Sequence, residues 1–143
     1  MQIHRTGRVN WTGGLKDGRG AISTQSGALA EYPYGFSSRF EGVAGSNPEE
    51  LLAAAHAACF TMALTLILGE AGLKAERLDT KAVVLLEQTD QGFAIPKIDL
   101  TLTATIAGID DEKFQTLAGL AKANCPVSKL FNAEISLVAV LTA

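Results

Sequence analysis

Apolar and polar residues follow different spacings along this chain, and each spacing predicts a different element. From Ile3 to about Phe40 the sequence is rich in Thr, Ser, Gly and aromatic residues, with turn signals at Gly13-Gly14 and at Asp17-Gly18. This composition is typical of short antiparallel strands joined by tight turns. We therefore expect a small β-rich segment at the start of the chain.

A long helix is predicted from Pro48 to about Ala71. Asn47 can cap its open N–H groups, Pro48 suits the first helical position, and Gly72 can end it. The body, residues 51–68, is apolar almost all the way round, whereas a surface helix has one polar face. We therefore expect a buried central helix, with a sheet of the same chain covering part of its surface and a second subunit covering the rest.

The second half of the chain returns to strand patterns. Residues 78–88 and 93–106 read as two strands, and the second alternates aliphatic residues with Thr and Asp. An amphipathic helix follows over residues 110–124, and a last strand over residues 134–141. This order predicts an α+β fold with antiparallel sheets, in one domain over residues 1–143.

Charge and composition narrow the classes of partner. The 143 residues are 48% hydrophobic and 19% charged, with a net charge of -3 and a pI near 5.3. Such a chain offers no basic surface for nucleic acid or for an anionic membrane, and its low charge fits a buried subunit interface. His56, Thr61 and Thr65 make the long helix a poor membrane span. The N-terminus lacks the pattern of a secretory signal, so we expect a cytoplasmic protein.

Two cysteines carry the candidate chemistry. Cys59 lies in the middle of the apolar helix, where an isolated cysteine is most often a small buried hydrophobe. Cys125 precedes Pro126 at a predicted cap, where helical N–H groups favour a thiolate. The chain lacks the close-spaced Cys and His pairs of most zinc sites, so no metal is expected. In a reducing compartment, a bridge between the two thiols is more typical of chemistry than of structure.

A thiol that reacts with a peroxide needs a cation to stabilise its thiolate and a second thiol to rescue the sulfenic acid. Arg39 is a candidate for the cation, and Glu49 could hold it by paired hydrogen bonds. Ten helical residues from Glu49 to Cys59 advance about 15 Å, too far for those two to touch directly. Arg39 must bridge them or Glu49 must come from a partner, so we expect the site beside a subunit interface.

Two other functions fit the same residues. His56 stands three positions before Cys59 and shares its helix face, as the base of a cysteine hydrolase or transferase would. A non-enzymatic protein that binds a small hydrophobic ligand is the second alternative, with cysteines that only fill space. Loss of activity on replacing His56 distinguishes the first, and inertness of both thiols toward peroxide distinguishes the second.

The segments around both cysteines resemble the OsmC/Ohr family of bacterial hydroperoxide reductases. The resemblance covers essentially the whole chain and rests on a capped helix start, an Ala-Cys-Phe segment and a distant Cys-Pro-Val-Ser segment. Further stretches are most similar to the osmotically inducible OsmC branch. The matching segments are 46–51, 54–60 and 124–128, with 3–11, 34–42 and 55–58 for the branch.

The resemblance implies an antioxidant, cysteine-based peroxidase that acts in the stress response. It implies an intertwined α+β homodimer, with Cys59 as the peroxidatic cysteine and Cys125 as the resolving one. The activating Arg and Glu of the family fall on Arg39 and Glu49. Because the arginine lies in different segments in the two branches, the alternatives for that role are Arg5, Arg8 and Arg19.

The resemblance also implies the substrate and the reductant. Family members reduce organic hydroperoxides better than hydrogen peroxide. They carry no bound cofactor and take electrons from an external dithiol, for which dihydrolipoamide or a lipoylated protein is the expected source.

Overall fold

A computed structural model describes residues 1–142 of the chain. The chain forms two compact units, one of residues 1–51 and one that begins at Leu52, and each is described by itself.

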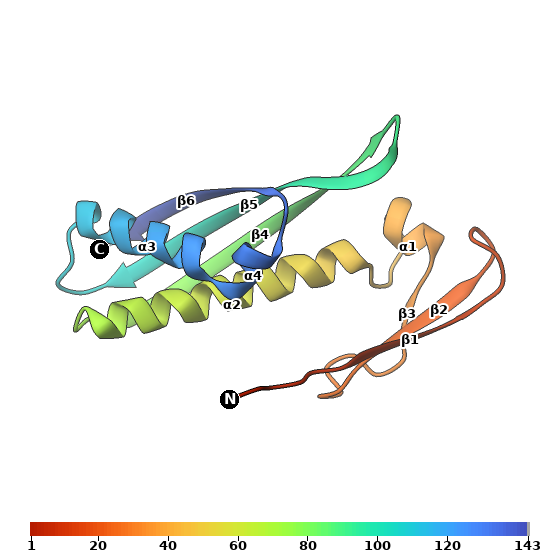
Figure 1. Ribbon diagram of the computed structural model, residues 1–143, viewed down its shortest axis with the longest axis horizontal. Helices are drawn as coiled ribbons and strands as arrows, with labels where there is room; N and C mark the ends of the chain where they lie inside the picture. Colours follow the sequence, from red (N-terminus) through yellow and green to blue (C-terminus); the bar gives the residue numbers. More distant parts are fainter. Residues whose placement is uncertain (143) are drawn as a thin grey trace. The chain divides into compact units, whose positions relative to one another are not determined.

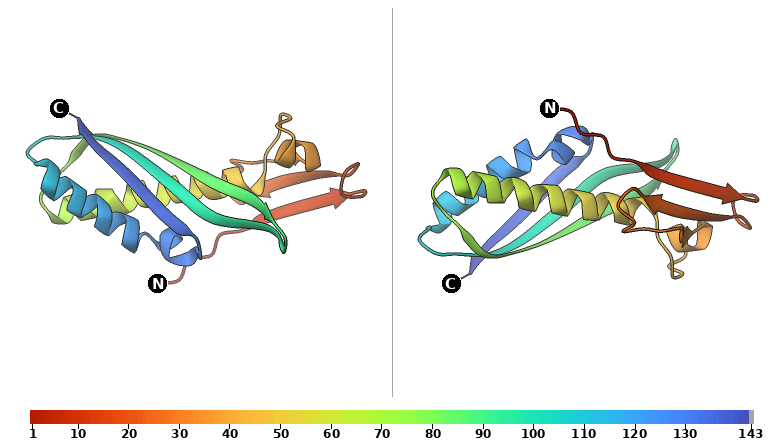
Figure 2. Two further views of the ribbon diagram at one scale, coloured as in Figure 1. Left: turned by 90° about the horizontal axis from the view of Figure 1, so that it is seen from above. Right: turned by 90° about the horizontal axis from the view of Figure 1, so that it is seen from below.

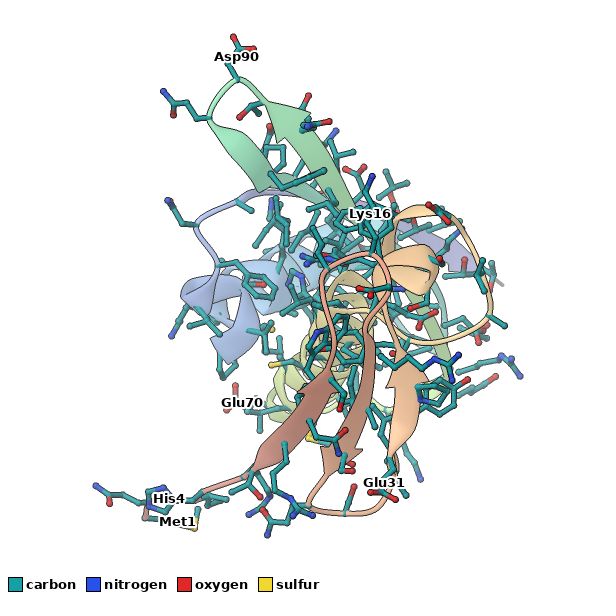
Figure 3. The ribbon with its side chains drawn as sticks, turned by 90° about the vertical axis from the view of Figure 1, so that its right-hand side faces the viewer. Met1, His4, Lys16, Glu31, Glu70 and Asp90 are labelled. Atoms are coloured by element: carbon teal, nitrogen blue, oxygen red, sulfur yellow. The ribbon has the colours of Figure 1, made fainter. Side chains whose placement is uncertain are left out.

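The first unit contains a three-stranded antiparallel sheet. Its strands are β1 (Gly7–Thr12), β2 (Arg19–Thr24) and β3 (Tyr32–Tyr34), paired in that order. Lys16 and Glu31 mark the connections at opposite ends of this sheet (Figure 3). The expected antiparallel strands are confirmed over this stretch.

The chain after β3 departs from the predicted strands. Residues Phe36–Phe40 form a short helix, α1, which carries Arg39. The hydroxyl of Ser38 explains the change, because it accepts the N–H of Gly35 at 2.9 Å and donates to the carbonyl of Ser46 at 2.9 Å. Such side-chain bonds compete with strand pairing and turn the backbone into a helical loop.

The long helix, α2, runs from Pro48 to Glu70, within a residue of its predicted end. Asn47 caps it by accepting the N–H of Glu50 at 2.8 Å. Gly72, with φ +74°, adopts the left-handed conformation that closes many helices. The first turn of α2 belongs to the first unit, and the body belongs to the second.

The second unit is built on the strands β4 (Ala75–Thr89), β5 (Gly92–Ile106) and β6 (Glu134–Thr142). Asp90 lies at the tip of the long β4–β5 hairpin (Figure 3). The pairing of β4 with β5 is antiparallel as predicted, but β5 and β6 run parallel. The sheet is therefore mixed, because α3 (Asp111–Asn124) and α4 (Pro126–Leu130) form a crossover between β5 and β6.

The helices α2 and α3 lie side by side across one face of this sheet (Figures 1 and 2). Between them and β5 lies the main core, which has Phe60 and Leu64 from α2 and Phe114 from α3, all fully buried. The mixture of packed helices and sheet confirms the α+β prediction.

A single chain buries a smaller part of the α2 surface than the sequence suggests. Its fully buried residues form a single stripe at a spacing of four, from His56 through Phe60 and Leu64 to Leu68. Only 22% of its most apolar window is buried, and Met62 and Leu66 are 76% and 64% exposed. A second apolar face of α2 thus remains uncovered in a single chain.

Candidate active site

Cys125 lies where α3 ends and α4 begins. Its backbone N–H donates to the carbonyl of Ala121 at 3.0 Å, which closes α3, and it is the N-cap of α4 with Pro126 in the first position. The predicted cap position is confirmed. The side chain is fully buried in the core of the second unit.

Cys59 lies in the middle of α2, beside the buried stripe of that helix, and is only partly buried. Its thiol lies close enough to the Cys125 thiol for each to shift the pKa of the other, although the two residues are 66 positions apart in the sequence. Both thiols are free. The structure therefore brings together the two cysteines that the sequence singled out, one partly exposed and one buried.

The surroundings shift the pKa values of the two thiols in opposite directions. Burial raises the pKa of Cys59, the neighbouring Cys125 raises it further, and the backbone N–H of Val127 acts in the opposite direction. Burial alone would also raise the pKa of Cys125. Other groups outweigh this effect of burial and bring the pKa of Cys125 below its ordinary value. They are the Cys59 thiol, the N–H groups of Val127 and Ser128, and the Ser128 hydroxyl.

These groups explain why α4 matters to the site. They lie at the start of α4, whose first N–H groups have no partner within the helix and whose cap residue is Cys125. Within the second unit, a single negative charge on the thiol pair is therefore held best on Cys125.

His56 lies on the face of α2 that carries Cys59, but its hydrogen-bond partner is Ser128. The Nε2 atom of His56 lies 2.7 Å from the Ser128 hydroxyl, and both side chains are buried. Burial lowers the pKa of His56, so the ring is neutral near pH 7. The structure thus does not place His56 as a direct base for Cys59, which the hydrolase alternative requires.

Arg39 and Glu49 form an ion pair within the first unit. Nη2 of Arg39 lies 2.7 Å from Oε1 of Glu49, and Nε lies 3.2 and 3.3 Å from the two carboxylate oxygens. The Arg39 side chain is 36% exposed and that of Glu49 is 10% exposed. The guanidinium also lies over the Phe40 ring, 5.2 Å from its centroid. The predicted contact between Arg39 and Glu49 is present.

Arg39 is also distinguished from the alternative arginines. Over residues 1–142 the arginine ion pairs are those of Arg39 with Glu49 and Arg77 with Asp79. Arg5 donates instead to the carbonyl of its neighbour His4 at 3.0 Å. Across the same described part of the chain, no three His, Cys, Asp or Glu side chains come together as a metal site.

Sequence reasoning missed Ser128 and Val127, which surround Cys125. A signal was present, because Cys125 and Ser128 are three residues apart, as are His56 and Cys59. Residues three apart share a helix face. When the two thiols meet, the histidine and the serine beside them are therefore brought together as well.

A family model of OsmC-like proteins matches residues 41–139, more than half of the chain. The chain belongs to the OsmC-like family. It is 53% identical over 137 residues to the peroxiredoxin OsmC of Escherichia coli strain K12, covering 96% of each chain. The family predicted from the sequence is confirmed.

Solved structures agree with this assignment of the OsmC-like chain. The organic hydroperoxide resistance protein OhrB of Bacillus subtilis matches with a TM-score of 0.67 and 29% identity, over 96% of this chain and 98% of that one. An OsmC-like protein from Mycoplasma pneumoniae matches with a TM-score of 0.77 over 100% of both chains. At 13% identity the second match supports the fold alone.

Proposed function

We propose that this chain is a thiol-dependent peroxidase that reduces organic hydroperoxides to alcohols, with Cys59 as the peroxidatic and Cys125 as the resolving cysteine. One observation carries the assignment of roles: the two free thiols lie beside each other, and Cys59 is partly accessible whereas Cys125 is fully buried. A peroxide reaches the accessible sulfur first, and the enclosed sulfur is already beside it.

The reaction has two steps on the protein. The Cys59 thiolate attacks the distal oxygen of the hydroperoxide, so an S–O bond forms, the O–O bond breaks, and the alkoxide leaves and takes a proton to become the alcohol. Cys125 then attacks the sulfur of the sulfenic acid, so an S–S bond forms, the S–O bond breaks, and water is released. An external dithiol restores both thiols by disulfide exchange.

The first step needs a thiolate on Cys59, while the second unit by itself favours a charge on Cys125. A fixed cation corrects this imbalance, and an arginine stays charged at every working pH. The Arg39–Glu49 pair supports Arg39 in this role, because Glu49 holds the guanidinium by three hydrogen bonds. We assign thiolate stabilisation to Arg39 and its orientation to Glu49.

The substrate is an organic hydroperoxide, and the electron donor is a dithiol. The first follows from the relatives, which include the organic hydroperoxide resistance protein OhrB. A dithiol such as dihydrolipoamide, free or on a lipoylated protein, suits the proposed disulfide because its second thiol resolves the mixed disulfide within one molecule. No bound cofactor takes part in this scheme.

The working form is a cytoplasmic homodimer in which a second copy covers α2. By length and composition α2 is the one described helix apolar enough to cross a membrane, and the core helix of a soluble protein passes the same test. A groove of about 580 Å³ between α2 and β4 adds concave apolar surface on the same helix, with lining residues Ala57, Ala58, Thr61, Met62, Thr65, Leu78, Asp79 and Thr80. An exposed apolar face of this length marks an association surface.

A charge on this face tests the dimer. Leu66→Glu places a carboxylate on the uncovered side of α2, and Leu120→Glu makes the same change at an exposed leucine of α3. We expect sedimentation to give a dimer for the wild type and Leu120→Glu and a shift to monomer for Leu66→Glu. A monomeric wild type at micromolar concentration contradicts the dimer.

Steady-state turnover tests the peroxidase assignment. The wild type with dihydrolipoamide should reduce cumene hydroperoxide faster than hydrogen peroxide, and Cys59→Ser should abolish both reactions. Replacement of His56 should leave turnover measurable, since the peroxidase scheme needs no base there. Full activity in Cys59→Ser contradicts the scheme.

A further inference from the structure

The buried histidine of α2 is not explained by the two thiol steps. His56 is fully buried, its Nε2 atom lies 2.7 Å from Oγ of Ser128, and its Nδ1 atom has no hydrogen-bond partner. Its ring stands edge-on to Phe131, with 5.4 Å between the ring centroids. A buried ring nitrogen without a hydrogen-bond partner, such as Nδ1 of His56, costs stability. That the fold keeps this residue points to a role for the contact that its Nε2 atom makes.

Ser128 connects this histidine to the thiol pair. Ser128 is the third residue of α4, whose cap residue is Cys125, and its backbone N–H and hydroxyl both lower the pKa of the Cys125 thiol, which lies beside Cys59. The contacts therefore form one chain, from His56 through Ser128 and Cys125 to Cys59. All four side chains come from α2 and from the start of α4.

The direction of the protons along this chain decides what it does. If Nε2 of His56 carries the hydrogen, it donates to Ser128, and the single proton of the hydroxyl is free to point at Cys125. If Nδ1 carries the hydrogen, Ser128 must donate to Nε2, and Cys125 loses its hydroxyl donor. The second arrangement also leaves a buried N–H unpaired, which folded proteins avoid more strictly than an unpaired acceptor. The geometry therefore favours the Nε2–H form.

We propose that His56 is a positioning residue for the resolving step: its Nε2–H holds the Ser128 hydroxyl so that the hydroxyl donates to the Cys125 sulfur and keeps it ready as the nucleophile. The inference rests on the proposed function. In this step the Cys125 thiolate attacks the sulfur of the Cys59 sulfenic acid, the S–S bond forms and the S–O bond breaks. The departing hydroxide takes up a proton from solvent, which balances the proton that Cys125 gave to solvent on ionising.

Apart from Arg39, which is assigned to the Cys59 thiolate above, the charged groups on the described elements around these residues are few. On α2 the titratable neighbours are Cys59 and His56 themselves, and on α4 the next residue, Lys129, is exposed. On α3 the ammonium of Lys122 donates to the carbonyl of Ile135 at 3.2 Å. On β5, Asp99 pairs with Lys97 at 3.3 Å and accepts from Ser136. Because burial lowers the pKa of His56 and keeps its ring neutral near pH 7, the pH response of the resolving step above that pH is assigned to the two thiols.

The test measures the two steps separately as pH varies. Reduced protein is mixed with one equivalent of cumene hydroperoxide, quenched with a thiol-alkylating reagent, and weighed intact to follow sulfenic acid and disulfide. The variants are Ser128→Ala and His56→Leu, which remove the donor or its holder, and His56→Gln, whose amide can still donate to Ser128. Thr116→Ala is the matched control, because its hydroxyl bonds only the helix carbonyl of Glu112.

We expect Ser128→Ala and His56→Leu to form the sulfenic acid at the wild-type rate. Both should close the disulfide about tenfold more slowly near neutral pH, because a higher pKa leaves less of the Cys125 thiol ionised. The deficit should vanish at high pH, where Cys125 is ionised without help. His56→Gln and Thr116→Ala should resemble the wild type. A wild-type pH profile in Ser128→Ala, or a loss that is equal at every pH, overturns the proposal.

Nitrogen NMR of the wild type decides the question without any variant. The spectrum should show the Nε2–H form of the His56 ring, and the Nδ1–H form contradicts the proposal. His4, the other histidine, is exposed, whereas His56 is fully buried. If the wild type fails to form a disulfide with peroxide, the proposed function fails. If it forms one but the variants and the tautomer disagree, only the role of His56 fails.

Discussion

Glu49→Gln is the substitution that tests most sharply how the proposed cation is held. The Glu49 carboxylate is 10% exposed and accepts three hydrogen bonds from Arg39, the shortest at 2.7 Å. Glutamine has nearly the same shape and keeps one oxygen acceptor, but it loses the charge and one acceptor oxygen. The guanidinium can then no longer bond through both of its edges at full strength.

The magnitude follows from the exposure of the pair. A hydrogen bond to a charged group contributes roughly 1.5–3 kcal/mol when it is buried. The Arg39 side chain is 36% exposed, so water screens the pair and the expected loss is lower. We estimate about 1 kcal/mol. For a chain of this size such a loss lowers Tm by roughly 3 °C. If the same energy orients Arg39 toward the Cys59 thiolate, oxidation of Cys59 slows roughly fivefold.

Glu50→Gln is the matched control. It makes the same charge change at the same helix start, but Glu50 is exposed and its carboxylate has no part in the Arg39 pair. Stopped-flow reduction of cumene hydroperoxide and thermal unfolding are measured for both variants. We predict slower Cys59 oxidation and a lower Tm in Glu49→Gln alone. Equal effects in the two variants, or no effect in either, contradict the proposed role of Glu49.

Three further predictions test other parts of the account. Cys125→Ser should reduce one peroxide per chain, gain about 16 Da as the trapped sulfenic acid, and then oxidise further with excess peroxide, as intact mass will show; clean repeated turnover contradicts it. Phe114→Ala should lose about 3–5 kcal/mol in urea unfolding, because Phe114 is fully buried between the helices and the sheet, while activity per folded molecule stays unchanged. Burial lowers the pKa of His56 below 6.5, so the unfolded chain binds a proton at this residue at a higher pH than the folded chain does. The free energy of unfolding should therefore fall as pH drops below about 6.5. His56→Gln should flatten that fall in urea midpoints, and an unchanged slope contradicts it.

Much of the fold could be predicted because its signals are local. Asn47 and Pro48 were enough to predict where α2 begins. The alternation of aliphatic and polar residues over 93–106 predicted β5 almost to its ends. The helical turn at Arg39 escaped prediction because it depends on Ser38 reaching the carbonyl of Ser46. The parallel pairing of β6 with β5 depends on the path of the whole crossover, which no local pattern records.

The site shows the same division between local and tertiary signals. The cap position of Cys125 was predictable from Pro126, and the pairing of Arg39 with Glu49 from charge and position. The role of Ser128 could not be read from the sequence, because its contact with His56 joins residues 72 positions apart. The approach of the two thiols was expected only from chemistry and from the resemblance, since neither local pattern requires it.

Intact mass and free-thiol titration of the reduced wild type, after one equivalent of cumene hydroperoxide or hydrogen peroxide, show whether Cys59 and Cys125 form a disulfide with peroxide. We predict rapid loss of both thiols and of about two mass units, faster with the organic peroxide, as the Cys59–Cys125 disulfide forms. Survival of both thiols, or stable oxidation of one cysteine while the other stays free, contradicts it.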